Sequence, residues 1–228
     1  MRRSAEPDAM EAEAAYAWLM DGAGGTFGDR FDAHVLASVL AVAIAETAAA
    51  GRPLSDGTGL RGAELAELVG PFFPHALLVM DCSDRSGELD VPEDERSLRE
   101  LLARYASARS TFELHLATVI ARRAMRPNHL WQDLGLRSRG ELSALMNRHF
   151  TALDERNAGD MKWKKFFYRL ICRDEGFRLC TAPSCAECDD FSVCFGDESG
   201  ESLLARNRLD VERSIVTTAS ARRFTNGP

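Results

Sequence analysis

The chain has 228 residues, 45% of them hydrophobic, and carries 35 acidic against 28 basic side chains, a formal net charge of -7 at pH 7. This composition excludes wholesale disorder and suffices for one sizeable hydrophobic core. The negative balance argues against nucleic acid and against an anionic membrane as the main partner, because both bind basic surfaces.

The N-terminal region has no features of an export signal or a membrane anchor. Arg2 and Arg3 are not followed by the apolar run that a secretory signal requires. The longest nearly apolar stretch, residues 35–45, has eleven residues, whereas a helix needs roughly 20 to cross a bilayer. We therefore expect a cytoplasmic protein without a membrane segment.

Apolar residues recur at helical spacing along most of the chain, and no segment shows the alternation of a strand. The pattern predicts helices over residues 10–20, 31–49, 62–69, 110–127, 138–150 and 161–177, and loops over residues 51–59 and 81–95. In a Ser-x-x-Glu motif the serine caps a helix N-terminus and the glutamate reaches back to it. Three such motifs occur: Ser97/Glu100, Ser110/Glu113 and Ser138/Glu141.

The predicted fold class is all-α, a helical bundle followed by a C-terminal cysteine-rich loop. The chain divides into an N-terminal lead-in with a weak helix (1–28), a helical domain (29–179), the cysteine-rich loop (180–196) and a variable, partly disordered tail (197–228).

A cysteine cluster points most directly to chemistry. Four of the six cysteines follow the spacing C-x4-C-x2-C-x5-C, and they are Cys180, Cys185, Cys188 and Cys194. In a reducing cytoplasm such a cluster is more often a metal or iron–sulfur site than a set of disulfides. We therefore expect these four thiolates to bind one metal centre.

The spacing leaves the kind of centre open. Structural zinc usually takes two cysteine pairs separated by a longer insert, which differs from four ligands on one short segment. The first three cysteines follow the C-x4-C-x2-C pattern of plant-type iron–sulfur proteins, although the fourth ligand of those proteins is remote. An iron–sulfur or mixed-metal sulfur cluster is therefore favoured, and zinc is the alternative.

Charge is distributed unevenly around the cysteines. Residues 181–205 contain acids and no base, whereas the segment before them is basic, with Lys162, Lys164, Lys165, Arg169, Arg173 and Arg178. A basic helix would stabilise a cluster held by several thiolates or attract an oxyanion such as molybdate. An ordinary solvated basic face explains the same residues equally well.

Three further residues are candidate metal ligands. Cys172 precedes the cluster by eight residues, but it can equally be a small buried residue of an apolar helix face. His129 can instead cap a turn, and His149 can complement a helix C-terminus. The aromatic side chains near these residues are predicted to be core: Trp131, Trp163 and Phe166.

These motifs resemble the NifQ family of nitrogen-fixation proteins. The resemblance is carried by residues 161–172 (MKWKKFFYRLIC), by the cysteine motif with Phe195 and Gly196 after it, and by residues 127–136 (PNHLWQDLGL) with the predicted helix at 138–150. It extends over roughly residues 30–196.

The resemblance implies a carrier of a molybdenum–iron–sulfur cluster that donates molybdenum for assembly of the iron–molybdenum cofactor of nitrogenase. It implies that the four motif cysteines bind the cluster, and that the nitrogenase iron protein and the NifEN scaffold are the recipients. It implies no catalysis, and the sequence contains no phosphate loop, H-E-x-x-H or G-x-G-x-x-G motif. A zinc-stabilised interaction module and a simple iron–sulfur electron carrier are the alternatives.

Overall fold

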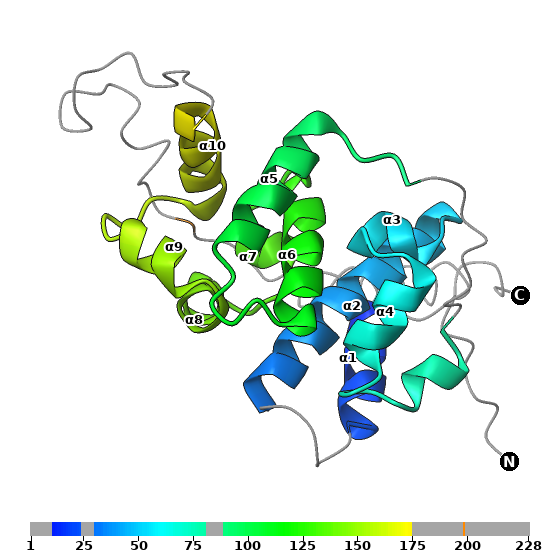
Figure 1. Ribbon diagram of the computed structural model, residues 1–228. Coiled ribbons are helices and arrows are strands. Elements are labelled where there is room, and N and C mark those ends of the chain that lie inside the picture. The colour runs from blue at the N-terminus through cyan, green and yellow to red at the C-terminus, as the bar shows by residue number, and fades with distance from the viewer. Residues whose placement is uncertain (1–10, 24–29, 81–88, 175–197, 199–228) are drawn as a thin grey trace, which may run out of the picture.

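The computed structural model of the chain describes residues 11–23, 30–80, 89–174 and 198 (Figure 1). Within these segments the regular elements are helices and no strand occurs, so the all-α prediction is confirmed for this part of the chain. The predicted cysteine-rich loop at 180–196 lies outside the described residues. The predicted domain boundaries at 28, 179 and 196 also lie outside them and stay predictions.

The helices of the described residues follow one another along the chain with mostly short connections. They are α1 (Ala12–Asp21), α2 (Arg30–Ala50), α3 (Leu54–Thr58), α4 (Gly62–Val69), the 3-10 helix η2 (Ala76–Leu78), α5 (Glu93–Arg104), α6 (Thr111–Ala124), α7 (Leu130–Asp133), α8 (Arg139–His149), α9 (Thr151–Arg156) and α10 (Trp163–Asp174).

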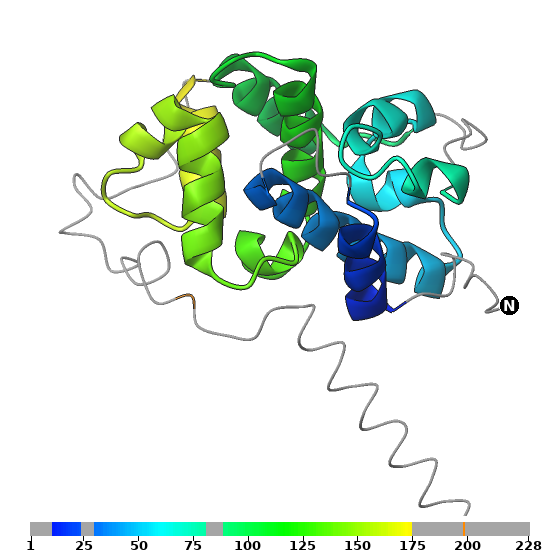
Figure 2. The ribbon, with the colours of Figure 1, turned by 90° about the horizontal axis from the view of Figure 1, so that it is seen from below.

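Helix α2 is the central element of the fold. Figure 2 shows it between the N-terminal helices α1, α3 and α4 and the helices that follow α5. By length and composition alone this 21-residue helix would be able to cross a membrane, a test that core helices of globular proteins also pass. Because 67% of its most apolar window is buried inside the fold, we assign it as the core helix.

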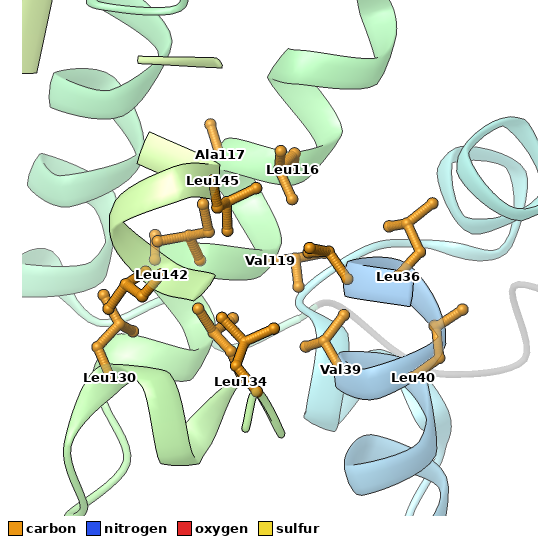
Figure 3. Close-up of a cluster of buried hydrophobic side chains, with 14 of the residues drawn as sticks. Leu36, Val39, Leu40, Leu116, Ala117, Val119, Leu130, Leu134, Leu142 and Leu145 are labelled. Atoms are coloured by element: carbon orange, nitrogen blue, oxygen red, sulfur yellow. The ribbon is translucent and has the colours of Figure 1, made fainter. Parts of the chain in front are cut away.

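The main core joins α2 to the later helices. Figure 3 shows Leu36 and Val39 of α2 facing Val119 of α6, with Leu134 beside them. All four side chains are at most 2% exposed. Each such burial contributes about 1.5–3 kcal/mol. This packing brings α7, which His129 directly precedes, and α8, which ends at His149, onto the same rigid scaffold.

Two of the three predicted serine caps are confirmed. The Ser110 hydroxyl accepts from the Glu113 backbone N–H at 3.2 Å, and the Ser138 hydroxyl accepts from the Glu141 N–H at 3.4 Å. The prediction at Ser97 is wrong, because α5 already begins at Glu93. Three acids in its first turn, residues 93–95, favour that earlier start by their interaction with the helix dipole.

Several helix bounds were predicted well and others were missed. Helix α4 has the predicted bounds, α2 differs from them by one residue at each end, and α1 begins two residues and ends one residue later than predicted. Helix α10 begins two residues later than predicted, and its predicted end at residue 177 lies outside the described residues. The segment 51–59 was predicted to be a loop, but it contains the short helix α3. That helix packs so closely on α2 that a Cβ added to Gly57 would lie 2.9 Å from the Ala43 Cβ.

Gly135 lets the connection between α7 and α8 approach α2. Its φ is +71°, in the left-handed region, and an added Cβ would lie 2.6 Å from the Ser38 carbonyl oxygen and 2.8 Å from the Val42 Cγ2. A side chain here would therefore be strained in φ and would also collide with backbone.

We expect Gly135→Ala to lower the free energy of unfolding by about 2–4 kcal/mol, the sum of left-handed strain and overpacking. Gly51→Ala is the matched control, because Gly51 has φ +61° but no atom within 4 Å of an added Cβ. It should cost only about 1–2 kcal/mol. Denaturant titration of both variants measures the difference, and equal losses would contradict the close approach to α2.

Candidate functional site

The sequence-predicted ligands are not gathered into one site among the described residues. The four motif cysteines, Cys180, Cys185, Cys188 and Cys194, lie outside these residues. Cys172 is a free, half-buried thiol near the end of α10. Within the described part of the chain, no three His, Cys, Asp or Glu side chains are grouped so that they could hold a metal ion.

His129 is the residue that precedes α7, and its backbone fixes the start of that helix. Its N–H donates to the Gln132 Oε1 at 3.2 Å, and its carbonyl accepts from the Asp133 N–H at 3.0 Å. His129 is therefore the N-cap residue of α7, which agrees with the capping alternative, and its role as a metal ligand stays a prediction. Its side chain is 33% exposed, and its ring Nδ1 lies 3.1 Å from the Glu198 Oε1.

Glu198 has a second basic partner, Arg139, at the first turn of α8. The Arg139 Nη1 donates to the Glu198 Oε2, while its Nη2 donates to the Asp160 carbonyl and Oδ1 at 2.8 Å each. The side chain of Glu198 is only 5% exposed. One carboxylate thus contacts α7 and α8 together, four positions after the last motif cysteine.

A buried polar network lies behind His129 and ties α7 to α10. The Asp133 carboxylate, 1% exposed, accepts from the Lys164 Nζ at 2.5 Å and from the Asn128 Nδ2 at 3.0 Å. Burial lowers the pKa of Lys164 below its ordinary value, and the hydrogen bond and charge of Asp133 oppose that effect. Lys164 also donates to the Arg126 carbonyl. The network therefore fixes the start of α10 against the α6–α7 connection.

Arg123 continues this network into the core. Its side chain is fully buried, and its Nε donates to the Asp133 carbonyl at 2.6 Å. Its two terminal nitrogens donate to the two Glu46 carboxylate oxygens at 2.7 and 2.9 Å. Since Glu46 belongs to α2, this bidentate pair joins the central helix to α6 and α7.

His149 lies in a different polar cluster. Its Nε2 is 3.0 Å from the Asp32 Oδ1, its Nδ1 is 3.4 Å from the Glu113 Oε1, and its side chain is 9% exposed. It is the last residue of α8, as the capping alternative expected. Both ring nitrogens therefore face carboxylates of α2 and α6, and the observed contacts are those of a residue that joins helices. Its role as a metal ligand stays a prediction.

The aromatic residues near the candidate ligands belong to the core, as predicted. Trp131, Trp163 and Phe166 are 3%, 2% and 6% exposed. The indole nitrogens of both tryptophans are buried without a hydrogen-bond partner among the described residues.

Sequence reasoning did not single out Arg139, Asp133 or Glu198. Arg139 follows the Ser138 cap by one position, and Asp133 closes α7, so both lie next to motifs that were recognised. Glu198 lies two residues beyond the part that resembles NifQ. Of the residues in this polar network, the sequence pattern pointed only to Lys164, which belongs to the basic run before the cysteines.

A comparison with protein families decides the classification. The family model named NifQ matches residues 35–196. The chain belongs to the NifQ family of nitrogen-fixation proteins. The NifQ match begins at Val35 within α2 and extends through α10 and all four motif cysteines, so the expected resemblance over roughly residues 30–196 is confirmed.

Individual NifQ proteins agree with this assignment. The chain is 40% identical over 172 residues to a NifQ homolog of Sinorhizobium fredii, with 75% of each chain covered. It is 38% identical over 176 residues to NifQ of Rhodobacter capsulatus, covering 75% of this chain and 93% of that protein. With NifQ of Azotobacter vinelandii it shares 37% identity over 151 residues, covering 61% of this chain and 77% of the relative. No solved structure matches the chain.

Proposed function

We propose that this NifQ protein carries molybdenum as part of a molybdenum–iron–sulfur cluster and donates it for assembly of the nitrogenase iron–molybdenum cofactor. The observation that carries the proposal is that the family match spans the helical domain and the complete C-x4-C-x2-C-x5-C motif. A family of nitrogen-fixation proteins with four clustered thiolates is suited to handling a metal–sulfur group.

The donor set fits this cargo. Soft thiolates suit iron–sulfur chemistry, and Cys180, Cys185, Cys188 and Cys194 supply four of them within fifteen residues. A cuboidal unit of three irons asks for three thiolates, one per iron. The fourth cysteine is then available to molybdenum or to a fourth iron. A carrier must also release its metal, and incomplete ligation of molybdenum by the protein would favour release.

Residues that precede and residues that follow the cysteine motif in the sequence both support the proposal. Helix α10 leads toward the cysteines and carries Cys172 as an auxiliary candidate, and its Lys164 is locked to Asp133. After the motif, Glu198 is bound at His129 and Arg139. His129 thus contacts a residue four positions after Cys194, which favours it over His149 as a non-thiolate ligand.

In this proposal the protein acts in the cytoplasm as a carrier and not as an enzyme. The nitrogenase iron protein and the NifEN scaffold are the proposed recipients of the molybdenum. Nucleic acid and membrane are not proposed as partners, because the chain carries a net charge of -7.

Metal analysis of the full chain purified without oxygen tests the proposal. We expect iron, sulfide and molybdenum to copurify with the protein and to give a visible charge-transfer absorption. Zinc as the sole metal would refute the carrier and favour a zinc-stabilised interaction module. Iron without molybdenum, even after incubation with molybdate and reductant, would instead favour a simple electron carrier.

A further inference from the structure

An internal carboxylate lies in a basic cradle that the folded domain builds from two helix starts. We use the term cradle for His129 and Arg139. The two Glu198 oxygens are divided between them, with Oε1 at 3.1 Å from the His129 Nδ1 and Oε2 bound by the Arg139 Nη1. Because the Glu198 side chain is 5% exposed, this contact is a nearly desolvated one.

The cradle is held in place by groups other than Glu198. The Arg139 Nη2 donates to the Asp160 carbonyl and Oδ1 at 2.8 Å and to the Met161 carbonyl at 3.2 Å. Asn157 shapes that acceptor turn, since its side chain bonds both the N–H and the carbonyl of Met161 at 2.9 Å. Asp160 itself has φ +54°, a strained conformation that the turn maintains. Arg139 is therefore held by three acceptors besides Glu198.

The local charges balance only with Glu198 in place. Among the described residues, two neighbouring groups of ion pairs together contain four permanent cations and four carboxylates. One consists of Arg123, Arg126 and Lys164 with Glu46 and Asp133, and the other of Arg139 with Asp160 and Glu198. Glu198 is also close enough to raise the pKa of Lys164 by its charge. Removal of this carboxylate leaves these described residues with one cation in excess in total, and Arg139 then keeps only its ion pair with Asp160, whose side chain is 78% exposed. A partly buried excess cation favours an anion as its replacement partner.

We propose that the cradle is a binding site for a tetrahedral oxyanion, and that the Glu198 carboxylate is its internal occupant, which the anion displaces. Arginine binds carboxylates and tetrahedral oxyanions through the same planar set of donors. Two oxygens of a tetrahedral anion can take the places of the two Glu198 oxygens. His129 and Arg139 then donate to the anion as they do to Glu198.

The identity of the anion as molybdate rests on the proposed function, whereas the presence of an oxyanion site does not. Glu198 follows Cys194 by four residues, so its Cα lies within about 14 Å of the Cys194 Cα by chain length alone. Molybdate bound in the cradle would therefore be held near the end of the cysteine motif. The cradle would act as an entry site for the metal in its oxyanion form.

Calorimetric titration of the metal-free, full-length protein with molybdate at neutral pH tests the site. We expect Glu198→Gln to bind molybdate about tenfold tighter than the unmodified chain, because the competing carboxylate is gone. Arg139→Gln should weaken binding at least about tenfold, the loss of one charge-assisted hydrogen bond. Arg137→Gln is the matched control and should bind molybdate like the unmodified chain. The Arg137 side chain is 68% exposed, and its ion pair is with Glu141 and not with a residue of the cradle.

The gain in Glu198→Gln cannot come from misfolding, so it is the decisive result. Binding that is no tighter in Glu198→Gln, or that is unchanged in Arg139→Gln, would overturn the proposal. The same titration with sulfate separates the two parts of the inference. Sulfate binding without molybdate binding would remove the link to molybdenum. The titration uses metal-free protein, so its outcome does not depend on the metal cluster. Loss of cluster binding in cysteine variants is therefore an independent result, and it tests only the proposed function.

Discussion

Replacing Cys185 or Cys188 with serine should abolish binding of iron and molybdenum while leaving the helical content of the protein unchanged. Serine has the shape of cysteine, but its hydroxyl stays protonated and is a hard, weak ligand for iron–sulfur chemistry. The helices α1 to α10 are packed around a core to which the motif contributes no described side chain. We therefore expect metal content near zero with an unchanged far-ultraviolet circular dichroism spectrum.

Cys82→Ser is the matched control, since Cys82 lies outside the motif by almost a hundred residues of sequence. It should retain the iron and molybdenum of the unmodified chain. Full metal occupancy in Cys185→Ser and Cys188→Ser would defeat the assignment of the motif. A loss of metal in all three variants would point to a general effect of thiol removal.

Sequence patterns predicted the helices whose signals are local. Helix α2 contains a nearly continuous apolar run that is buried from Val35 to Ile44, and Ser110 and Ser138 cap their helices by accepting from backbone N–H groups three residues later. Helices α3 and α9 were missed because they have five and six residues. Isolated helices of that length are marginal in water, and packing against α2 and α8 stabilises them instead.

The site was less predictable than the fold because its contacts are distant in sequence. His129 was recognised from its motif, but its partner Glu198 is 69 residues away, and Arg139 is 59 residues from the same carboxylate. Nothing in the local pattern distinguishes Glu198 from the other acids that follow the cysteines. His149 illustrates the reverse case, because its neighbours Asp32 and Glu113 are 117 and 36 residues away and give it a packing role.

The polar residues of the PNHLWQDLGL segment explain why α7 can position the cradle. Asn128 and Lys164 donate to the Asp133 carboxylate, and Arg123 donates to the Asp133 carbonyl. Three side chains thus fix the last residue of a helix that has only four residues. Gly135 then turns the chain against α2. The segment thereby fixes the position of His129. Its polar residues are explained by this structural role as well as by direct contact with a metal.

Replacing Arg123 with methionine should lower the free energy of unfolding by about 3 kcal/mol. The change removes a fully buried guanidinium and leaves the Asp133 carbonyl and the Glu46 carboxylate without their main donor. Breaking a buried ion pair on one side costs about 3–5 kcal/mol. We expect the lower end of this range, because the Glu46 side chain is 31% exposed and can be partly hydrated.

Denaturant titration measures this loss, and two further variants identify its cause. Arg126→Met should cost less than about 1 kcal/mol, because Arg126 is 28% exposed and lies 3.7 Å from the Glu46 Oε2. Combining Arg123→Met with Glu46→Gln should recover part of the loss, since no buried charge then lacks a partner. Equal costs for Arg123→Met and Arg126→Met would contradict a central role for the Arg123 pair. A double variant whose losses simply add would show that the two side chains do not act together in joining α2 to α6 and α7.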